Sequence, residues 1–506
     1  MDEIYILGFD LGASGGRAML GKLNESEKRI VVEEVYRFPN YIVRIGDSLY
    51  WDVLRLWYEV KNGIKLAYKK YGDKIVSIGV DTWGLDFALL DEKGELVGNP
   101  HMYRDPRTKG LMEEVFKIVP KEKIYMETGI QFMRINTLYH LYAMVKYGSP
   151  QLKIAKYFLM MPDLFHYWLT GGTKLVEYTD ATTTQFVNPR TKKWCYDILE
   201  ALGIPTDIFP EIVEAGTDLG SLSTSVAVEL DIPPEKAKDI KIHAPATHDT
   251  ASAVAAGPMI NESAGYISSG TWSLVGIELP EPLINKKAME YNFTNEGGVF
   301  NTIRFLRNVQ GMWLVEESRR ILRSQGYELT YDEILKQAQA AKPFKALIDP
   351  DHPRFVSPIN MVEEINKYLE ETKQEKPSSI GEYFRIIFDS LALKYRYVFE
   401  LAMDVSGRKL THINIFGGGS RNWLLNQITA DVTGIPVYAG PDEATSLGNI
   451  LTQAIGLGII RSLKDIREYV INSYAPKKFE PNHTKIHDDA YAKFLDILEL
   501  TPMPLA

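Results

Sequence analysis

Three glycine-bearing turns could do chemistry in this chain, because each combines small residues with hydroxyl groups directly after an apolar stretch. They are "GFDLGASGGRAML" (8–20), "SSGTWSL" (268–274) and "FGGGSRNWLL" (416–425). A turn rich in glycine, serine and threonine can direct several backbone N–H groups and hydroxyls at one anion, as phosphate binding requires. Each turn alone is also explained as an ordinary tight turn. Three of them in matching contexts predict phosphate-binding loops.

Two aspartates stand beside such segments. Asp10 directly follows the first apolar stretch and precedes the first glycine turn. A carboxylate in that place could hold Mg²⁺ beside a polyphosphate, and the alternative is a turn-forming aspartate. Asp249 is the single carboxylate in "HAPATHDTASAV" (243–254), among small and apolar neighbours. Because a charge in such surroundings must be solvated or matched to a partner, Asp249 is a candidate for a chemical role.

A further stretch, "GVDTWGLDFALLD" (79–91), places Asp81, Trp83, Gly84 and Asp86 near the end of a predicted strand. Aromatic faces, carboxylates and a glycine that permits close approach suit a polyol, which offers C–H faces and many hydroxyls. The competing interpretation is a half-buried strand with Trp83 in the core. Trp83 and Gly84 are therefore candidate sugar-binding residues.

Several other kinds of site are excluded by the sequence. No G-x-G-x-x-G opens a helix, and "GYISSGTW" (265–272) has Thr271 where a Walker motif needs lysine. There is no H-E-x-x-H, and His483 with His487 fall in a polar tail. Cys195 is the only cysteine, which excludes an intrachain disulfide framework and a multi-cysteine zinc site.

Bulk properties describe a cytoplasmic enzyme. The 506 residues exceed the ~250–300 at which single cores stop growing, so at least two domains are expected. The formal net charge of −9 argues against a nucleic-acid binder. No apolar run approaches the ~18 residues needed to span a bilayer, and the start "MDEIYILGFD" has no basic leader, so no membrane partner is expected.

The N-terminal region predicts a mixed sheet. Strands are expected over 4–9, 17–23 and 29–38, then a helix from Asp52 to Tyr71, then a strand over 74–84. Adjacent hairpin strands are antiparallel and a crossover through a helix is parallel, so this order gives a sheet of both kinds.

The second half repeats this plan. A strand, a turn and a second strand over 264–279 are followed by a long helix over 380–405, whose start carries a predicted capping box of Ser379 and Glu382. A strand, a glycine run, a helix and a strand then occupy 411–440. The Pro-rich segment 230–245 is the expected boundary. We therefore predict an α/β protein with domains over 1–245 and 246–458 and a helical tail over 459–506.

The motifs resemble one family. "GFDLGASGGR", "SSGTWS", "IFGGGSRN" and "EATSLGN" resemble the phosphate-1, phosphate-2 and adenosine motifs of the FGGY carbohydrate kinases. That resemblance implies two ribonuclease-H-like domains around a central cleft, as in the sugar kinase, heat-shock chaperone and actin superfamily. Within the family, six further stretches resemble those of rhamnulokinases: "GVDTWGLDFALLD", "YRDPRT" (103–108), "LMMPDLFHYWLTG" (159–171), "EYTDATTTQ" (177–185), "THDTASAV" (247–254) and "TNEGG" (294–298).

Roles carried over from the resemblance concern ATP, Mg²⁺ and a ketose sugar. Asp249 is implied as the general base and Asp10 as the residue that organises Mg²⁺. The β- and γ-phosphates of ATP are expected at Ala13, Ser14, Gly15, Gly16 and Arg17, with Thr271 and Gly418 on the nucleotide. The sugar is expected at Gly84, His248, Thr250 and Asn308. The resemblance also implies that Glu316 contacts the nucleotide, although rhamnulokinases have glutamine at this position.

The implied reaction is ATP-dependent phosphorylation of O1 of L-rhamnulose. The 6-deoxy group needs an apolar contact, for which Trp83, Phe87 and Trp272 are candidates. A fuculose, xylulose or ribulose kinase is the alternative within the family, because the sequence alone does not reveal how many hydrogen bonds the site makes to the sugar hydroxyls. A non-catalytic sugar-sensing protein or an actin-like assembling ATPase is the alternative outside it. No pattern indicates an oligomeric state.

Overall fold

The computed structural model describes residues 3–500, which divide into two compact units, each discontinuous in sequence. The first unit consists of Met1–Pro258, Leu279–Phe305 and Glu443–Tyr474. The second consists of Met259–Glu278, Leu306–Asp442 and Ala475–Ala506. These units differ from the contiguous division expected at residues 245 and 458. The segment carrying Asp249 belongs to the first unit, and the tail after residue 458 is divided between both.

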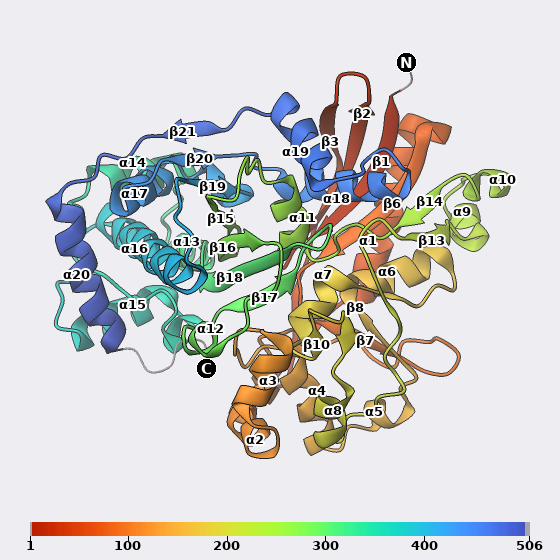
Figure 1. The fold of residues 1–506 in the computed structure, drawn as a ribbon, viewed down its shortest axis with the longest axis horizontal. Helices are drawn as coiled ribbons and strands as arrows, with labels where there is room; N and C mark the ends of the chain where they lie inside the picture. Colours follow the sequence, from red (N-terminus) through yellow and green to blue (C-terminus); the bar gives the residue numbers. More distant parts are fainter. Residues whose placement is uncertain (1–2, 501–506) are drawn as a thin grey trace. The chain divides into compact units, whose positions relative to one another are not determined.

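A six-stranded sheet in the order β13-β14-β6-β1-β2-β3 lies at the centre of the first unit (Figure 1). Strands β1, β2 and β3 are joined as antiparallel hairpins, and β6 pairs with β1 in parallel, as the sequence predicts. The bounds of the sheet strands are β1 (Ile4–Leu11), β2 (Gly15–Asn24), β3 (Arg29–Pro39), β6 (Ile75–Thr82), β13 (Asp218–Ser221) and β14 (Lys241–His243).

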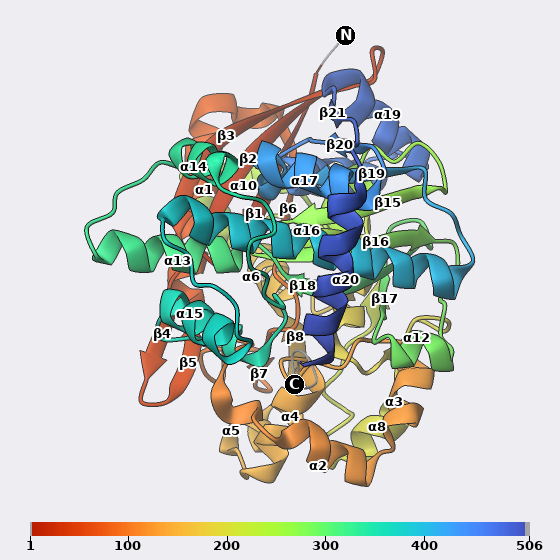
Figure 2. The same ribbon diagram turned by 90° about the vertical axis from the view of Figure 1, so that its left-hand side faces the viewer.

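Shorter strands surround this sheet. The sequence did not predict the hairpin of β4 and β5, which is set apart from the six-stranded sheet in Figure 2. The short strands are β4 (Ile42–Ile45), β5 (Ser48–Trp51), β7 (Phe87–Leu90), β8 (Tyr157–Met160), β9 (Val176–Glu177), β10 (Val187–Asn188), β11 (Lys193–Trp194) and β12 (Ile212–Val213). Strand β17 (Thr294–Gly297) is instead the edge strand next to β18 in the seven-stranded sheet.

Helices cover both faces of the first sheet. A Cβ on Gly8 of β1 would lie 2.7 Å from Asn449 Oδ1 of α18, and a Cβ on Gly63 of α1 would lie 2.6 Å from the ring of Phe9. Successive residues of a strand point to opposite faces, so α18 and α1 lie on opposite sides of β1. The helices of the first unit are α1 (Val53–Tyr71), α2 (Leu111–Ile118), α3 (Lys121–Thr128), α4 (Thr137–Lys146), α5 (Pro150–Ile154), α6 (Met161–Thr170), α7 (Tyr178–Ala181), α8 (Tyr196–Ala201), α9 (Thr224–Glu229), α10 (Pro234–Ala237), α11 (Asp249–Ala256), α12 (Lys286–Glu290), α18 (Ala444–Gly456) and α19 (Leu463–Ser473).

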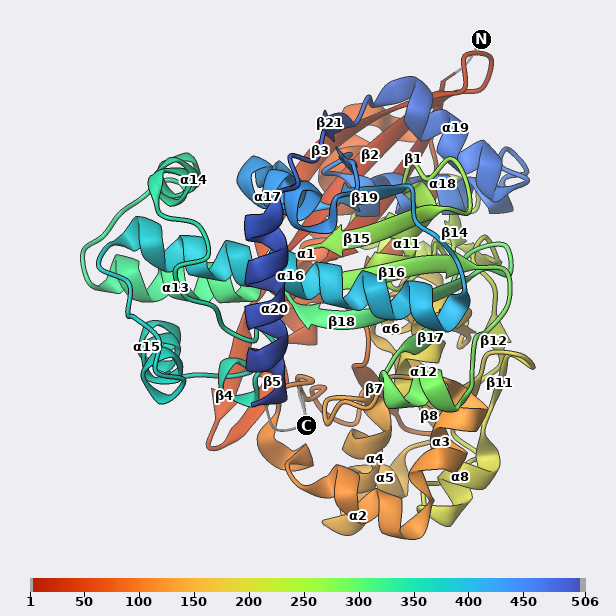
Figure 3. The ribbon, with the colours of Figure 1, turned by 60° about the vertical axis from the view of Figure 1, so that its left-hand side comes forward.

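The second unit repeats the strand order of the first, as the sequence predicts. Its order β18-β16-β15-β19-β20 matches β3-β2-β1-β6-β14, with β15 antiparallel to β16 and parallel to β19. In Figure 3 the strands β15, β16 and β18 run side by side, and a Cβ on Gly265 of β15 would touch Phe399 of α16. The elements are β15 (Ala264–Ser269), β16 (Trp272–Leu279), β18 (Ile303–Gln310), β19 (His412–Phe416), β20 (Val437–Ala439), β21 (Lys477–Phe479), α13 (Trp313–Ser324), α14 (Tyr331–Ala340), α15 (Met361–Glu371), α16 (Ile380–Ser406), α17 (Trp423–Thr433) and α20 (Lys485–Glu499).

The predicted N-cap residues of α1 and α16 are confirmed, but the predicted capping box of α16 is not formed. Asp52 caps α1 by accepting a hydrogen bond from Arg55 N, and Ser379 caps α16 by accepting one from Glu382 N. The predicted capping box at α16 is incomplete, however, because the Glu382 carboxylate accepts from Ser378 N and Oγ instead of Ser379 N. Across residues 3–500, no helix combines the length and hydropathy that crossing a bilayer would require.

Candidate active site

The carboxyl ends of β1 and β6 bring two predicted residues together. Asp10 on β1 is the register partner of Asp81 on β6, and on the other side of β1 it is the partner of Arg17 on β2. Arg17 Nη2 lies 2.8 Å from Asp10 Oδ2, and Arg17 Nη1 lies 2.6 Å from Glu443 Oε2. Burial alone lowers the pKa of Arg17, but the two carboxylates outweigh it and raise that pKa. Arg17 is therefore a permanent cation beside Asp10.

The turn after β1 is closed by its own backbone and by one asparagine. Gly12 N donates to Gly15 O over 2.8 Å, and Asn40 Nδ2 donates to Gly12 O over 2.9 Å. At Gly16 a Cβ would lie 2.3 Å from the Phe38 ring, so only glycine fits there. Ala13 and Ser14 thus form a short fixed turn, and Gly15, Gly16 and Arg17 begin β2.

A buried amide network fixes Asp81. Asn449 Nδ2 donates to Asp81 Oδ2 over 2.6 Å, and Asn449 Oδ1 accepts from Gln453 Nε2 over 2.7 Å. Asp81 Oδ1 is buried and has no hydrogen-bond partner. Burial and then the charge of Asp10 raise the pKa of Asp81. Three aspartates, Asp10, Asp81 and Asp249, therefore share one electrostatic environment.

Asp249 opens α11, with His248 as the residue before the first turn. Its Oδ1 accepts from Thr250 N over 2.6 Å and from Thr250 Oγ1 over 3.1 Å. The Asp249 side chain is 29 % exposed to solvent. Burial of its carboxyl group, and then the charge of Asp10, raise the pKa of Asp249 to about 7. A reachable carboxylate with a pKa near neutrality suits a general base.

Glu177 anchors the segment that carries Asp249. Its Oε2 atom accepts hydrogen bonds from Thr247 N and Oγ1, at 3.0 and 2.6 Å, and from Thr179 N and Oγ1, at 3.0 and 2.5 Å. Thr179 Oγ1 in turn accepts from His248 N over 3.2 Å. Thr82 N at the end of β6 donates to Thr247 O over 2.9 Å. The start of α11 is thus fixed to both the sheet and the buried Glu177.

We expect Glu177→Gln to lower the free energy of unfolding by about 1–2 kcal/mol, because hydrogen bonds to a charged acceptor are stronger than those to a neutral amide by about that amount. Urea unfolding measures the change, and the exposed Glu92→Gln serves as the matched control. Equal unfolding curves for Glu177→Gln and the control would contradict the anchoring role.

His248 lies between two carboxylates. Its Nε2 is 3.5 Å from Asp249 Oδ1 and its Nδ1 is 3.5 Å from Glu296 Oε2. The fully buried Arg304 places Nη1 3.0 Å from the same Glu296 oxygen. Burial, and then the charge of Arg304, lower the pKa of His248 well below its ordinary value, so the imidazole is neutral. A neutral ring can donate or accept a hydrogen bond without adding charge next to Asp249.

Gly84 adjoins this histidine, and the preceding Trp83 is buried. A Cβ on Gly84 would lie 3.1 Å from His248 Nε2 and 3.3 Å from Asp180 Oδ1, so the backbone is approachable only because the residue is glycine. The Trp83 indole donates to Asp86 Oδ2 over 2.9 Å and packs on Trp51, with ring centroids 4.2 Å apart. Phe87 instead lines a separate cavity, which argues against its predicted contact with the sugar.

In the second unit, Thr271 and Gly418 follow paired strands. Ser268 of β15 and Phe416 of β19 are register partners, so the turn after each strand starts at the same edge of the sheet. A Cβ on Gly419 would lie 2.0 Å from Ser269 Oγ, while one on Gly418 would meet nothing. The glycine run therefore packs against β15 and leaves Gly418 open.

Two other predicted residues of the second unit lie on other elements, of which α13 begins against the Thr271 turn, with Trp313 N donating to Thr271 O over 3.1 Å. Asn308 lies on β18, and Glu316 lies on the first turn of α13. The Glu316 carboxylate pairs with Arg319 Nη1 over 3.0 Å and is 56 % exposed. Its charge is thus already matched within its own helix.

Glu296, Arg304, Glu177 and Asn449 were not predicted as site residues. Three of them fall in stretches that the sequence already singles out, "EYTDATTTQ", "TNEGG" and "EATSLGN". A carboxylate inside a run of threonines, as at Glu177, was the available signal. Arg304 carried none, because nothing local distinguishes it from other strand residues.

The carboxylates at the ends of β1 and β6 fit the way proteins hold Mg²⁺. That ion takes one or two carboxylates and completes its shell with water and substrate phosphates. Asp10 with the unpartnered Oδ1 of Asp81 is such a set. In the described part of the chain, no three His, Cys, Asp or Glu side chains cluster so as to hold a metal by themselves.

Comparison with known proteins identifies both halves of the chain. Residues 5–252 match the N-terminal domain, and residues 265–457 the C-terminal domain, of the FGGY family of carbohydrate kinases. A rhamnulokinase of Halalkalibacterium halodurans is 43% identical over 480 residues, which cover 94% of this chain and 98% of the relative. A rhamnulokinase of Bacteroides thetaiotaomicron is 40% identical over 485 residues, covering 96% and 97%.

The fold is likewise shared with solved structures. The crystal structure of gluconate kinase from Lactobacillus acidophilus superimposes with a TM-score of 0.78 at 18% identity, covering 99% of this chain and 98% of that one. The prediction of a two-domain α/β fold of the sugar kinase and actin superfamily is therefore confirmed.

Proposed function

The chain belongs to the FGGY family of carbohydrate kinases, and we propose that it is a cytoplasmic enzyme that transfers a phosphoryl group from ATP to O1 of L-rhamnulose. ATP-dependent phosphorylation of a sugar follows from the family. The choice of sugar is supported by relatives named rhamnulokinase at 43% and 40% identity over nearly the whole chain.

Asp249 is the proposed general base, and the observation that carries this proposal is its place at the start of α11 with a pKa of about 7. The carboxylate accepts the proton of the attacking sugar hydroxyl as the bond to phosphorus forms. Thr250 orients Oδ1 through two hydrogen bonds. The neutral His248, together with the backbone at Gly84, is proposed to bind sugar hydroxyls, and Trp83 to bind the apolar C6 group.

The phosphates of ATP are proposed to bind at the loop from Ala13 to Arg17. Asp10 would hold Mg²⁺, which neutralises charge on the transferring phosphoryl group when bound. Arg17 competes for the same oxygen, since it lies 2.8 Å from Asp10 Oδ2. We infer that Arg17 releases Asp10 and turns to phosphate when the nucleotide and metal bind. Thr271, Asn308, Glu316 and Gly418 remain the proposed contributions of the second unit to nucleotide and sugar.

We expect kcat/KM for the sugar to rise with pH up to about pH 7 and then level. The base works only when deprotonated, and its pKa is raised to about 7 by burial and by Asp10. Below that value the rate constant falls roughly tenfold per pH unit, because kcat/KM for the sugar reports the ionisation of the enzyme form that the sugar binds. Initial rates at saturating Mg-ATP over a pH series measure this. A flat profile down to about pH 5 would contradict the assignment.

ADP release over a panel of L-rhamnulose, L-fuculose, D-xylulose, L-ribulose and glycerol tests the substrate. We expect L-rhamnulose to exceed the others in kcat/KM by about tenfold or more, since single-group differences in a sugar pocket give that scale of discrimination. If another sugar is preferred, the family and Asp249 stand and the sugar assignment is wrong. If ATP binds but no sugar is phosphorylated, the sugar-sensing or actin-like alternatives take its place.

A further inference from the structure

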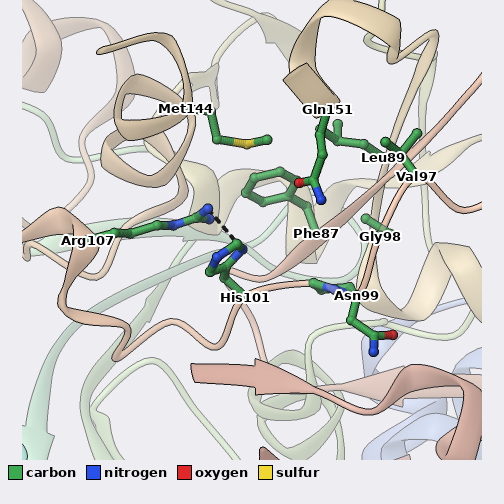
Figure 4. Close-up of a pocket in the computed structure, with 11 residues that line it drawn as sticks. Phe87, Leu89, Val97, Gly98, Asn99, His101, Arg107, Met144 and Gln151 are labelled. Carbon is green, nitrogen blue, oxygen red and sulfur yellow. Dashed lines mark hydrogen bonds between the residues drawn. The ribbon is translucent and has the colours of Figure 1, made fainter. Parts of the chain in front are cut away.

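A second cavity of the first unit has no part in the site described above. It lies between β7, the segment 97–101 and the helices α4 and α5 (Figure 4). Its volume is about 20 Å³. Its lining consists of Phe87, Ala88, Leu89, Val97, Gly98, Asn99, Pro100, His101, Arg107, Met144 and Gln151. None of these residues is acidic, and one is a permanent cation.

The cation is Arg107, and its polar partners are two imidazoles. Nε donates to His140 Nδ1 over 3.0 Å, and Nη1 lies 3.0 Å from His101 Nδ1. An arginine can only donate, so both Nδ1 atoms are acceptors and each ring carries its proton on Nε2. His140 Nε2 accordingly lies 3.0 Å from the Tyr103 carbonyl oxygen. Two neutral rings orient the guanidinium without balancing its charge.

Both histidines stay neutral at physiological pH. Burial, and then the charge of Arg107, lower the pKa of His101 to about 3 and move that of His140 well below its ordinary value. Burial also lowers the pKa of Arg107 to about 10, against the opposing charges of Asp105 and Asp86. The guanidinium nevertheless remains protonated at neutral pH.

The two carboxylates whose charges act on Arg107 accept their hydrogen bonds from other groups. Asp105 accepts from Leu49 N over 2.6 Å and from the backbone N of Arg107 over 2.8 Å. Asp86 Oδ2 accepts from the indoles of Trp51 and Trp83. Within residues 3–500, no carboxylate forms an ion pair with the Arg107 guanidinium, whose polar partners are the two rings. The guanidinium thus has no contacting counter-ion, and Asp105 and Asp86 offset its charge only through space.

The rest of the lining suits an anion of small size. In Figure 4 the His101 ring faces the Arg107 guanidinium, and the Gln151 amide lies beside the Phe87 ring. Gln151 lines the cavity with a side-chain amide that can donate to an anion, whereas the exposed Asn99 directs its amide away from Arg107 in Figure 4. Phe87, Val97 and Met144 supply apolar walls. A cavity of about 20 Å³ holds one or two water-sized groups, so a whole phosphate ion does not fit inside it.

We propose that this cavity binds a compact monovalent anion on Arg107: a halide, or one anionic oxygen of a carboxylate or phosphate that enters from outside. The apolar walls favour an ion that loses its water readily, so bromide and chloride bind more tightly than fluoride. The bound anion stabilises the first unit by placing a counter-charge in contact with Arg107, which Asp105 and Asp86 offset only through space.

Bromide is the probe for the test. Crystals of the full chain soaked in bromide are expected to show an anomalous-scattering peak within hydrogen-bonding distance of the Arg107 guanidinium. In solution, replacing fluoride by bromide at constant ionic strength is expected to raise Tm in a saturable way, by about 2 °C when bromide is at roughly ten times its dissociation constant. Inorganic phosphate distinguishes the two kinds of ligand. If phosphate competes with bromide, the site accepts an anionic oxygen, and if it does not compete, the site is specific for a halide.

Three variants make the outcome specific. Arg107→Gln is expected to lose the bromide response, while Lys109→Gln, which removes the same charge from an exposed neighbour, keeps it. Gln151→Glu places a carboxylate in the cavity, so it is expected to raise Tm in fluoride and to abolish any further rise in bromide. The proposal is overturned if no bromide binds at Arg107, or if Arg107→Gln responds to bromide as the unmodified protein does.

Discussion

Replacing Asp249 by asparagine is expected to lower kcat by about 10²–10⁴-fold, the usual contribution of a general base. Asparagine keeps the shape of the side chain and an oxygen that can accept from Thr250 N, so α11 starts as before. It cannot take the sugar proton, however, because an amide is not basic. The KM for ATP is expected to change little, since Asp249 is not among the residues proposed to bind nucleotide.

Steady-state rates with saturating sugar and Mg-ATP measure this change, and ATP binding by the variant is measured by calorimetry. A near-normal kcat with intact ATP binding would refute the assignment of the base. A Tm no lower than that of the unmodified protein is the control for folding, because the substitution removes no packing atoms and relieves a buried carboxylate whose pKa is raised to about 7.

Substituting Gly448 by alanine is expected to have the largest effect on stability. A Cβ at this position of α18 would lie 1.8 Å from the backbone oxygen of Ser252 in α11. Backbone cannot rotate away as a side chain can, so the two helices must separate. We expect a loss of about 3 kcal/mol or more in the free energy of unfolding, at the upper end of overpacking effects.

Activity is expected to fall with it, because α11 carries Asp249 at its first position. Urea unfolding and kcat are measured together with Gly172→Ala, an exposed glycine at which an added Cβ meets nothing. If Gly448→Ala unfolds at the same urea concentration as Gly172→Ala, the close contact between α11 and α18 is not present in solution.

The sequence by itself determined the local elements. Apart from the hairpin of β4 and β5, strand and helix positions from Ile4 to Thr82 follow from hydrophobic periodicity and capping residues, both of which are local properties. The repeated order of strands could be predicted for the same reason, because each half of the sequence contains the same local succession of strands, turns and a helix. The motif stretches also identified the family, which the matches over residues 5–252 and 265–457 confirm.

Only the tertiary structure decided which residues far apart in sequence belong to one unit. Helix α18 lies more than 350 positions after Asp81, yet its Asn449 donates a hydrogen bond to Asp81. Glu443, the residue just before α18, forms an ion pair with Arg17. The extra hairpin of β4 and β5 and the separate cavity behind Phe87 were equally hidden. Their positions depend on packing between distant segments.

Electrostatics was decided in the same way. Nothing in the neighbourhood of Asp249 in sequence sets its pKa, because the raising effect comes from burial and from Asp10, more than two hundred positions away. The neutral state of His248 similarly depends on burial and on Arg304. A sequence specifies which groups can ionise, whereas the free energy of ionisation depends on solvent exclusion and on charges that only folding brings near.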